Sequence, residues 1–179
     1  MGKLYVGVDL GKSGSLIGLK DSKILWKSKM PLIGKDVDTQ RIRRMLTEQV
    51  KTYGSIHLIM EKIAGVAPGA RFNMNSLYFQ SGLVEGLVAG LGIPFSRVAP
   101  QTWQKEMWSG TTVQMKVIAG DPAHGIPAKE KKDTKATSLI AARALYPDED
   151  FLATAQSRVA HDGIVDAVLI ATYAQRKGF

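Results

Sequence analysis

The chain has 179 residues, with 24 Lys and Arg, 16 Asp and Glu, a net charge of +8 and no cysteine. Its length favours a single globular domain over residues 1–179, since domains usually have about 100–150 residues. A hydrophobic content of 45% is enough for a core, which excludes intrinsic disorder. The absence of cysteine excludes disulfide frameworks, zinc ribbons, iron–sulfur clusters and thiol nucleophiles.

The positive charge is uneven along the chain. Residues 1–60 hold 11 basic and 5 acidic residues, which is +6 of the total. This excess predicts a basic face on the N-terminal half, which is either a solvated surface or an attraction for phosphates. No apolar run reaches about 18 residues and the N-terminus lacks a signal-peptide pattern, so we expect an intracellular protein without a membrane partner.

The first half of the chain is predicted to form strands, a helix and a further strand. Short apolar runs rich in β-formers predict strands, and apolar residues three and four positions apart predict a helix. In chain order the segments are strands 4–8, 16–19 and 24–26, helix 38–53 and strand 56–60. The first three strands can pair as antiparallel neighbours, with Asp21-Ser22 in the turn between the second and third.

The second half is predicted to be mostly helical. In chain order the segments are helix 75–91, strand 94–98 and helices 100–108, 136–146 and 162–175. Residues 109–130 are expected to be irregular, with one extra strand around 113–118. Three strands followed by alternating strands and helices predict an α/β or α+β sheet that is covered by helices.

Two acidic residues end predicted strands. Asp9 follows the strand 4–8, and Glu61 follows the strand 56–60. In an open α/β sheet with parallel strands, ligands bind at the edge formed by the carboxyl ends of the strands, so we expect both carboxylates there. A single Asp after a strand is more often only a turn residue, and neither position alone defines a site.

The last predicted helix adds two acids one turn apart. Asp162 and Asp166 lie on an otherwise apolar helix, where like charges repel and burial penalises an unpaired carboxylate. The helix macrodipole accounts for Asp162 at the N-terminus, but not for Asp166 one turn further. Four carboxylates in a chain without cysteine favour magnesium or manganese over zinc.

These acidic motifs carry a family resemblance. With VGVDLG at 6–11, LIMEK at 58–62 and DGIVDA at 162–167, the chain resembles the RuvC-type Holliday junction resolvases of the ribonuclease H-like superfamily. Further matches in family order cover nearly the whole chain: QSG at 80–82, AP at 99–100, Lys135 and RAL at 143–145. Bacterial members typically space the last two acids by three, whereas Asp162 and Asp166 are four apart here. The Asp162-Gly163 pair and the long loop after Glu61 look more like the phage branch.

The resemblance implies a mixed five-stranded sheet with helices on both faces, and a metal-dependent endodeoxyribonuclease. Such an enzyme resolves four-way junctions and related branched DNA by paired cuts that leave 5′ phosphates. Two Mg²⁺ ions per active site, for which Mn²⁺ substitutes, would be held by Asp9, Glu61, Asp166 and Asp162. Lys135 would stabilise charge on the phosphate, or is a solvated lysine in the first turn of a helix. His161 is either a structural residue or an outer ligand, and the localisation expected is cytoplasmic (host cytoplasm for a phage-encoded protein).

Further residues are candidates for contacts with DNA or with a second copy. The candidates for DNA contact are Lys12, Arg71, Phe72, Lys105, Lys131 and Lys132. Phe72 is expected in a loop over 64–73, where it could stack on an exposed base, whereas Trp103 and Trp108 are expected in the core or at a dimer contact. The resemblance also implies a homodimer through the helix 75–91. The glycines at 82, 86 and 90 would either permit that close approach or let the helix lie near its own sheet.

Two other classes of function are alternatives to a nuclease. DLGKSGS at 9–15 resembles the first phosphate-binding hairpin of sugar and acetate kinases, which share the sheet core. Those enzymes need two lobes, and a second glycine-rich phosphate hairpin is absent from this sequence. A non-catalytic DNA-architectural protein is the other alternative, and acids at all three elements weigh against it.

Overall fold

The computed structural model describes residues 2–63, 71–125 and 127–179, and its centre is one five-stranded sheet. The order of strands is β3-β2-β1-β6-β7, where β1 is Leu4–Asp9, β2 Ser15–Lys20, β3 Lys23–Lys29, β6 Ile56–Glu61 and β7 Phe95–Val98. Strands β1, β2 and β3 pair antiparallel, whereas β1, β6 and β7 run parallel. The fold is therefore the α/β fold with a mixed sheet that the sequence predicts.

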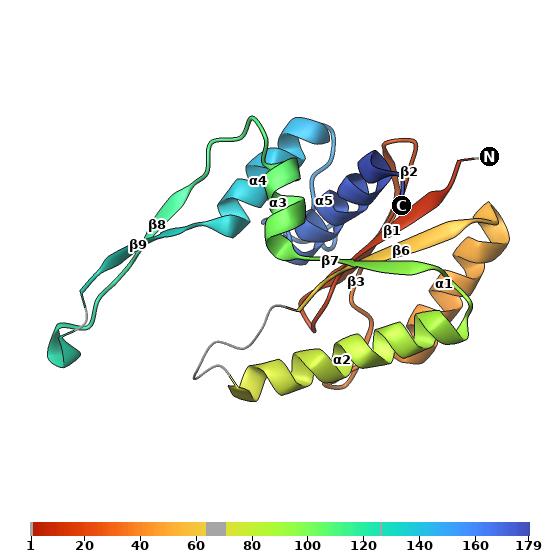
Figure 1. Cartoon of the computed structure of the whole chain (residues 1–179), viewed down its shortest axis with the longest axis horizontal. Coiled ribbons are helices and arrows are strands. Elements are labelled where there is room, and N and C mark those ends of the chain that lie inside the picture. Colours follow the sequence, from red (N-terminus) through yellow and green to blue (C-terminus); the bar gives the residue numbers. More distant parts are fainter. Residues whose placement is uncertain (1, 64–70, 126) are drawn as a thin grey trace.

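Helices cover both faces of this sheet (Figure 1). One face carries α1 (Thr39–Tyr53) and α2 (Arg71–Gly90), and the other carries α3 (Pro100–Met107), α4 (Thr134–Leu145) and α5 (Asp162–Lys177). The alternation along β1 explains the two layers, because Leu4, Val6 and Val8 belong to the core beneath α1 and α2 while their neighbours face α5.

Local signals in the sequence set several element boundaries. The Asp38 carboxylate accepts a hydrogen bond from Arg41 N at 2.9 Å and begins α1, and Gly54 ends this helix with φ 73°. Asp21 and Ser22 form the β2–β3 turn with φ of 49° and 59°, the left-handed conformation that tight hairpin turns need. Asp133 caps α4 through Ala136 N at 3.3 Å.

Two parts of the chain differ from the sequence prediction. Helix α2 begins at Arg71, so residues 71–73 are helical and not part of a loop, while 64–70 lie outside the described residues. Residues 109–130 include the predicted extra strand, as β8 (Met115–Ile118), but β8 pairs with the unexpected strand β9 (Lys129–Lys132). A short 3-10 helix (Pro122–His124) lies between these two strands, and a small hairpin of β4 (Leu32–Ile33) and β5 (Asp36–Val37) precedes α1.

The pair β8–β9 projects from the body as an arm, which we call the hairpin arm (Met115–Lys132) (Figure 1). It leaves the body on the side where β1 and β6 have their carboxyl ends. Among the helices that the structure describes, none has the length and apolar character needed to cross a bilayer.

Candidate functional site

The four acids of the sequence analysis meet at the carboxyl edge of the sheet. The parallel register pairs Val8 with Met60, which places the next residues, Asp9 and Glu61, side by side at the ends of β1 and β6. Helix α5 packs on β1 and begins at Asp162, so Asp162 and Asp166 come from its first two turns. The charges of Glu61, Asp162 and Asp166 all act on Asp9.

Two glycines allow α5 to approach the sheet closely enough for this arrangement. A Cβ on Gly7 in β1 would overlap the backbone carbonyl of Ala167. A Cβ on Gly163 would lie 2.5 Å from the carbonyl oxygen of Ser13 and 3.0 Å from Asp9 Oδ2. Real Cβ atoms do not come this close to other atoms, so only glycine fits at either position.

Burial and mutual repulsion dominate the electrostatics of the cluster. Burial, followed by the charges of Asp166 and Glu61, raises the pKa of Asp9 to about 8. Burial also raises the pKa of Asp166 to about 7, and the pKa of Glu61 is raised for the same reason. A cation is needed for these groups to be ionised together near neutral pH.

The exposed side of the cluster carries a lysine. Lys135 Nζ in the first turn of α4 lies 2.5 Å from Asp162 Oδ2, and both side chains are more than half exposed, at 65% and 51%. The hydrogen bond to Asp162 raises the pKa of Lys135, while the charge of Lys135 acts to lower the pKa of Asp9 and Asp166. Lys135 is therefore positioned where the cluster opens to solvent.

Buried hydrogen-bond donors hold two of the carboxylates. Trp103, fully buried in α3, donates from Nε1 to Glu61 Oε2 at 2.8 Å. Ser138 in α4 hydrogen-bonds Asp166, and its Oγ accepts from Trp108 Nε1 at 3.3 Å. The expectation that Trp103 lies in the core is confirmed, but its bond to Glu61 and the role of Ser138 were not predicted. The one sequence signal for these contacts is the presence of a tryptophan in the short predicted helix that follows strand 94–98.

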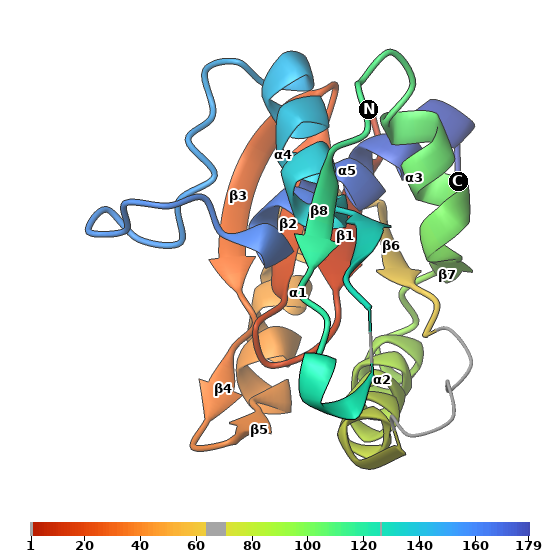
Figure 2. The ribbon, with the colours of Figure 1, turned by 90° about the vertical axis from the view of Figure 1, so that its left-hand side faces the viewer.

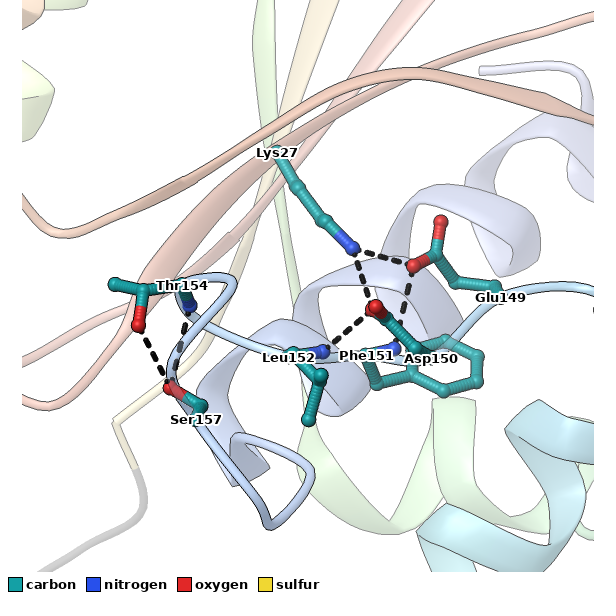
Figure 3. A network of polar contacts seen from close by, with 7 residues as sticks. All are labelled: Lys27, Glu149, Asp150, Phe151, Leu152, Thr154 and Ser157. Atoms are coloured by element: carbon teal, nitrogen blue, oxygen red, sulfur yellow. Dashed lines mark hydrogen bonds and ion pairs between the residues drawn. The ribbon is translucent and has the colours of Figure 1, made fainter.

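The loop before α5 is fastened to the edge of the sheet (Figure 3). Lys27 in β3 bonds Glu149 at 2.5 Å and Asp150 at 2.8 Å, and these carboxylates also accept from the backbone of Phe151 and Leu152. Phe151 is fully buried with φ 56°, an uncommon conformation for a large side chain. This network fixes the chain that leads into Asp162.

His161 is the N-cap of α5. Its Nδ1 accepts a hydrogen bond from Ile164 N at 3.3 Å, and its own backbone N–H donates to the carbonyl of Phe151 at 2.9 Å. Of the two roles expected for His161, structural residue or outer ligand, these contacts support the structural role.

The carboxylate cluster suits a hard divalent cation by its chemistry. Within residues 2–63, 71–125 and 127–179, no group of three or more acidic, histidine or cysteine side chains is arranged to hold a metal ion. The carboxylates nevertheless offer only oxygen atoms as ligands, are largely buried and repel one another. A divalent cation would relieve this repulsion. The residues that would bind such an ion are Asp9, Glu61 and Asp166, with Asp162 at the exposed side.

The basic candidates for DNA contact fall in three places. Lys12 lines an open groove of about 420 Å³ with Lys29 and Arg41 at the β3 side of the sheet edge. Lys131 and Lys132 lie in the hairpin arm, which points toward the viewer in Figure 2.

Lys105 lies away from the acids. It lines a groove of about 730 Å³ with Arg176 and Lys177, near the opposite end of α5. Arg71 and Phe72 begin helix α2, and their side chains lie outside the described part of the chain. DNA contact by all six candidate residues, in these places, stays a prediction.

The fold is similar to that of several solved structures. No family model matches the chain, and no curated protein matches it in sequence. Two of the similar structures are T. thermophilus RuvC in complex with Holliday junction substrate, with 14% identity and a TM-score of 0.59, and Thermus thermophilus RuvC, with 14% identity and a TM-score of 0.58. Each comparison covers 98% of this chain and 96% of the other. This likeness shows the ribonuclease H-like fold.

Proposed function

We propose that this ribonuclease H-like chain is a metal-dependent, structure-selective endodeoxyribonuclease that resolves Holliday junctions and related branched DNA as a single catalytic domain. The observation that carries the proposal is the buried carboxylate cluster at the sheet edge, where Asp9 has a pKa raised to about 8. Titratable groups with strongly shifted pKa values, at the carboxyl ends of the strands of an open sheet, are typical of functional sites. The similar fold of T. thermophilus RuvC in complex with Holliday junction substrate supports the substrate class.

The chain's own residues divide into ligands and supporting groups. Asp9, Glu61 and Asp166, with Asp162, would hold two Mg²⁺ ions, which Mn²⁺ can replace. When bound, such ions activate a water and stabilise the leaving oxygen of the phosphodiester. Trp103 orients Glu61 through its 2.8 Å hydrogen bond, and Lys135 can exchange Asp162 for a phosphate oxygen when DNA binds.

DNA can reach the cluster from the side of α2. Glu61 lines a hollow of about 270 Å³ between the end of β6 and α2, together with Ser81 and Arg97. Lys62 also lines this hollow, and the groove of Lys12, Lys29 and Arg41 lies on the other side of the edge, so lysines flank the acids. This distribution supports a scissile strand that crosses the carboxyl ends of β6 and β1.

A nicking assay on a four-way junction tests the proposal. Wild-type protein should make Mg²⁺-dependent cuts with 5′ phosphates, and Asp9→Asn and Glu61→Gln should each reduce cleavage by about a thousandfold or more, or about 4 kcal/mol of transition-state stabilisation. Junction binding by these variants should persist or increase, because a negative charge near phosphate is removed. Asp36→Asn, an exposed acid in β5, is the matched control. Junction-independent labelling by ATP would favour the kinase-like alternative instead.

We further propose a homodimer, because paired cuts in a junction need two active sites. Within the part of the chain that the structure describes, a Cβ on Gly82, Gly86 or Gly90 would meet nothing within 4 Å, so these glycines do not serve contact with the sheet. Gly86 and Gly90 lie on the exposed side of α2 and are open to a second copy, while Gly82 lines the hollow beside Glu61. Gly86→Leu should weaken dimerisation and yield nicked circles in place of linear product from a cruciform plasmid. A wild-type monomer that still makes paired cuts would contradict the dimer.

The phage-like branch and a place in host cytoplasm are the finer part of the proposal. The Asp162-Gly163 pair and the long segment after Glu61 support it. An alignment of the chain with bacterial and phage resolvases tests the branch directly, since bacterial members would share the three-residue spacing.

A further inference from the structure

The hairpin arm stands apart from the body and is rooted beside the carboxylate cluster. All eight residues of β8 and β9 are exposed. At its base, Asp133 N donates to the carbonyl of Gln114 at 2.8 Å, and Gln114 N donates to Thr137 Oγ1 at 3.0 Å. Asp133 is also the N-cap of α4, two residues before Lys135. DNA at the cluster is therefore close to the base of the arm.

The strand register separates the charges of the arm onto one face. Residues that are directly opposite in an antiparallel pair share a face, and neighbours along a strand alternate. The register pairs Lys116 with Lys131 and Ile118 with Lys129, which places three lysines and no acid on one face. The other face holds Met115, Val117, Glu130 and Lys132, which have no net charge. We call the first of these the basic face (Lys116, Ile118, Lys129, Lys131).

The basic face is unfavourable for the hairpin by itself. Lys116 and Lys131 are directly opposed, and like charges in that position destabilise a pair of strands. Lys116 reaches Asp133 at 3.3 Å, but Lys129 and Lys131 form no ion pair with any residue the structure describes. Lysines also discourage edge pairing of exposed strands, but this would not require them to collect on one face. A polyanion would relieve the repulsion.

We propose, on the basis of the proposed nuclease function, that the basic face of the hairpin arm binds the phosphate backbone of a duplex arm next to the cut. A four-residue strand is about 13 Å long, which matches the rise of about four base pairs of DNA. Lys116, Lys129 and Lys131 are spaced within that length. The contact is sequence-independent and positions the duplex, while the carboxylate cluster carries out the chemistry.

The test compares two double variants by the salt dependence of binding to a four-way junction. Lys129→Gln with Lys131→Gln removes two charges from the basic face. Lys23→Gln with Lys51→Gln removes two exposed charges at the opposite end of the sheet and is the matched control. The arm variant should reduce the slope of log affinity against log salt by about 1.8, which is about 0.9 per lost phosphate contact, and weaken binding about tenfold near physiological salt. The control should keep the wild-type slope, and melting curves should show all three proteins folded.

The possible outcomes separate this inference from the proposed function. If the arm variant binds with the same slope and affinity as the control while wild-type protein still cuts junctions, the inference about the arm is overturned and the nuclease stands. If wild-type protein neither binds nor cuts branched DNA, the proposed function fails and the arm proposal fails with it. A loss of slope confined to the arm variant supports the arm inference, and Mg²⁺-dependent cutting by wild-type protein decides the nuclease function separately.

Discussion

The carboxylate edge and the hairpin arm are held in opposite ways. At the edge, α5 is pressed against β1 with only glycine at Gly7 and Gly163, so the acids sit at distances set by backbone contacts. The arm has exposed strands on both faces and is tied to the body mainly through Gln114 and Asp133. Buried like charges need rigid surroundings because small shifts change their energies greatly. A surface that binds a flexible polyanion does not need such rigid surroundings.

The largest effect is expected from adding one methyl group at the edge. Gly7→Ala places a Cβ against the backbone of Ala167, which cannot move without shifting α5, so stability should fall by about 3 kcal/mol. Gly86→Ala, where a Cβ meets nothing among the described residues, should instead stabilise α2 by about 0.5–1 kcal/mol. Urea unfolding of both variants measures the difference. Equal stabilities would show that the contact between α5 and β1 is not rigid.

The second effect is a pH dependence of stability that originates in the cluster. With pKa values of about 8 for Asp9 and about 7 for Asp166, the folded protein binds protons that the unfolded chain has released near pH 4. Stability in EDTA should therefore fall as pH rises from 6.5 to 8.5, by about 2–3 kcal/mol or roughly 4–10 °C in Tm.

Asp9→Asn provides the comparison for this pH profile. This variant lacks one of the two titrating carboxyl groups, so its stability should fall less steeply with pH. It should also be more stable than wild type at pH 8.5. Magnesium should restore wild-type stability at high pH, because it binds the ionised carboxylates. A profile of wild type that rises with pH in EDTA would contradict the burial of these groups.

A smaller effect is expected at the hydrogen bond between Trp103 and Glu61. Trp103→Phe keeps most of the ring but leaves the buried carboxylate without this donor, so the pKa of Glu61 should rise further. Junction cleavage should fall about tenfold at neutral pH, corresponding to about 1.4 kcal/mol, and recover in part at higher pH.

Trp26→Phe is the matched control for this change. The Trp26 Nε1–H is buried and has no hydrogen-bond partner among the described residues, so its loss breaks no bond. Both variants remove an indole from a packed site, and only Trp103 contacts an acid of the cluster. The same tenfold loss in Trp26→Phe would assign the effect to packing.

The sequence predicts the parts of the fold that depend on local pattern. The short apolar run 4–8, rich in β-formers, identifies β1, and the Asp21-Ser22 turn identifies the antiparallel pair that follows. Asp9 and Glu61 were placed at one edge because strand direction alone decides where the ends of strands lie.

Features that depend on distant partners were not predictable in this way. Strand β9 has the sequence KEKK, which lacks β-formers and alternation, and it is a strand only because β8 pairs with it. The Trp103 bond joins residues 42 apart, and no local pattern reports it. Residues 71–73 follow a glycine- and alanine-rich segment that resembles a loop, yet they continue into α2.

The smallest effect is expected where the arm is removed. Replacing residues 115–132 with a short Gly-Ser turn joins Gln114 to Asp133, which are already bonded at 2.8 Å, and leaves the cap of α4 in place. Because no described residue of the arm belongs to the buried core, the free energy of unfolding should change by less than about 0.5 kcal/mol and Tm by less than about 2 °C. Amide exchange should agree, with fast exchange in β8 and β9 of the intact protein and exchange limited by global unfolding in β1. A loss of more than about 5 °C, or slow exchange in the arm, would mean that it folds with the body, and the contrast between a rigid edge and an independent arm would then have to be abandoned.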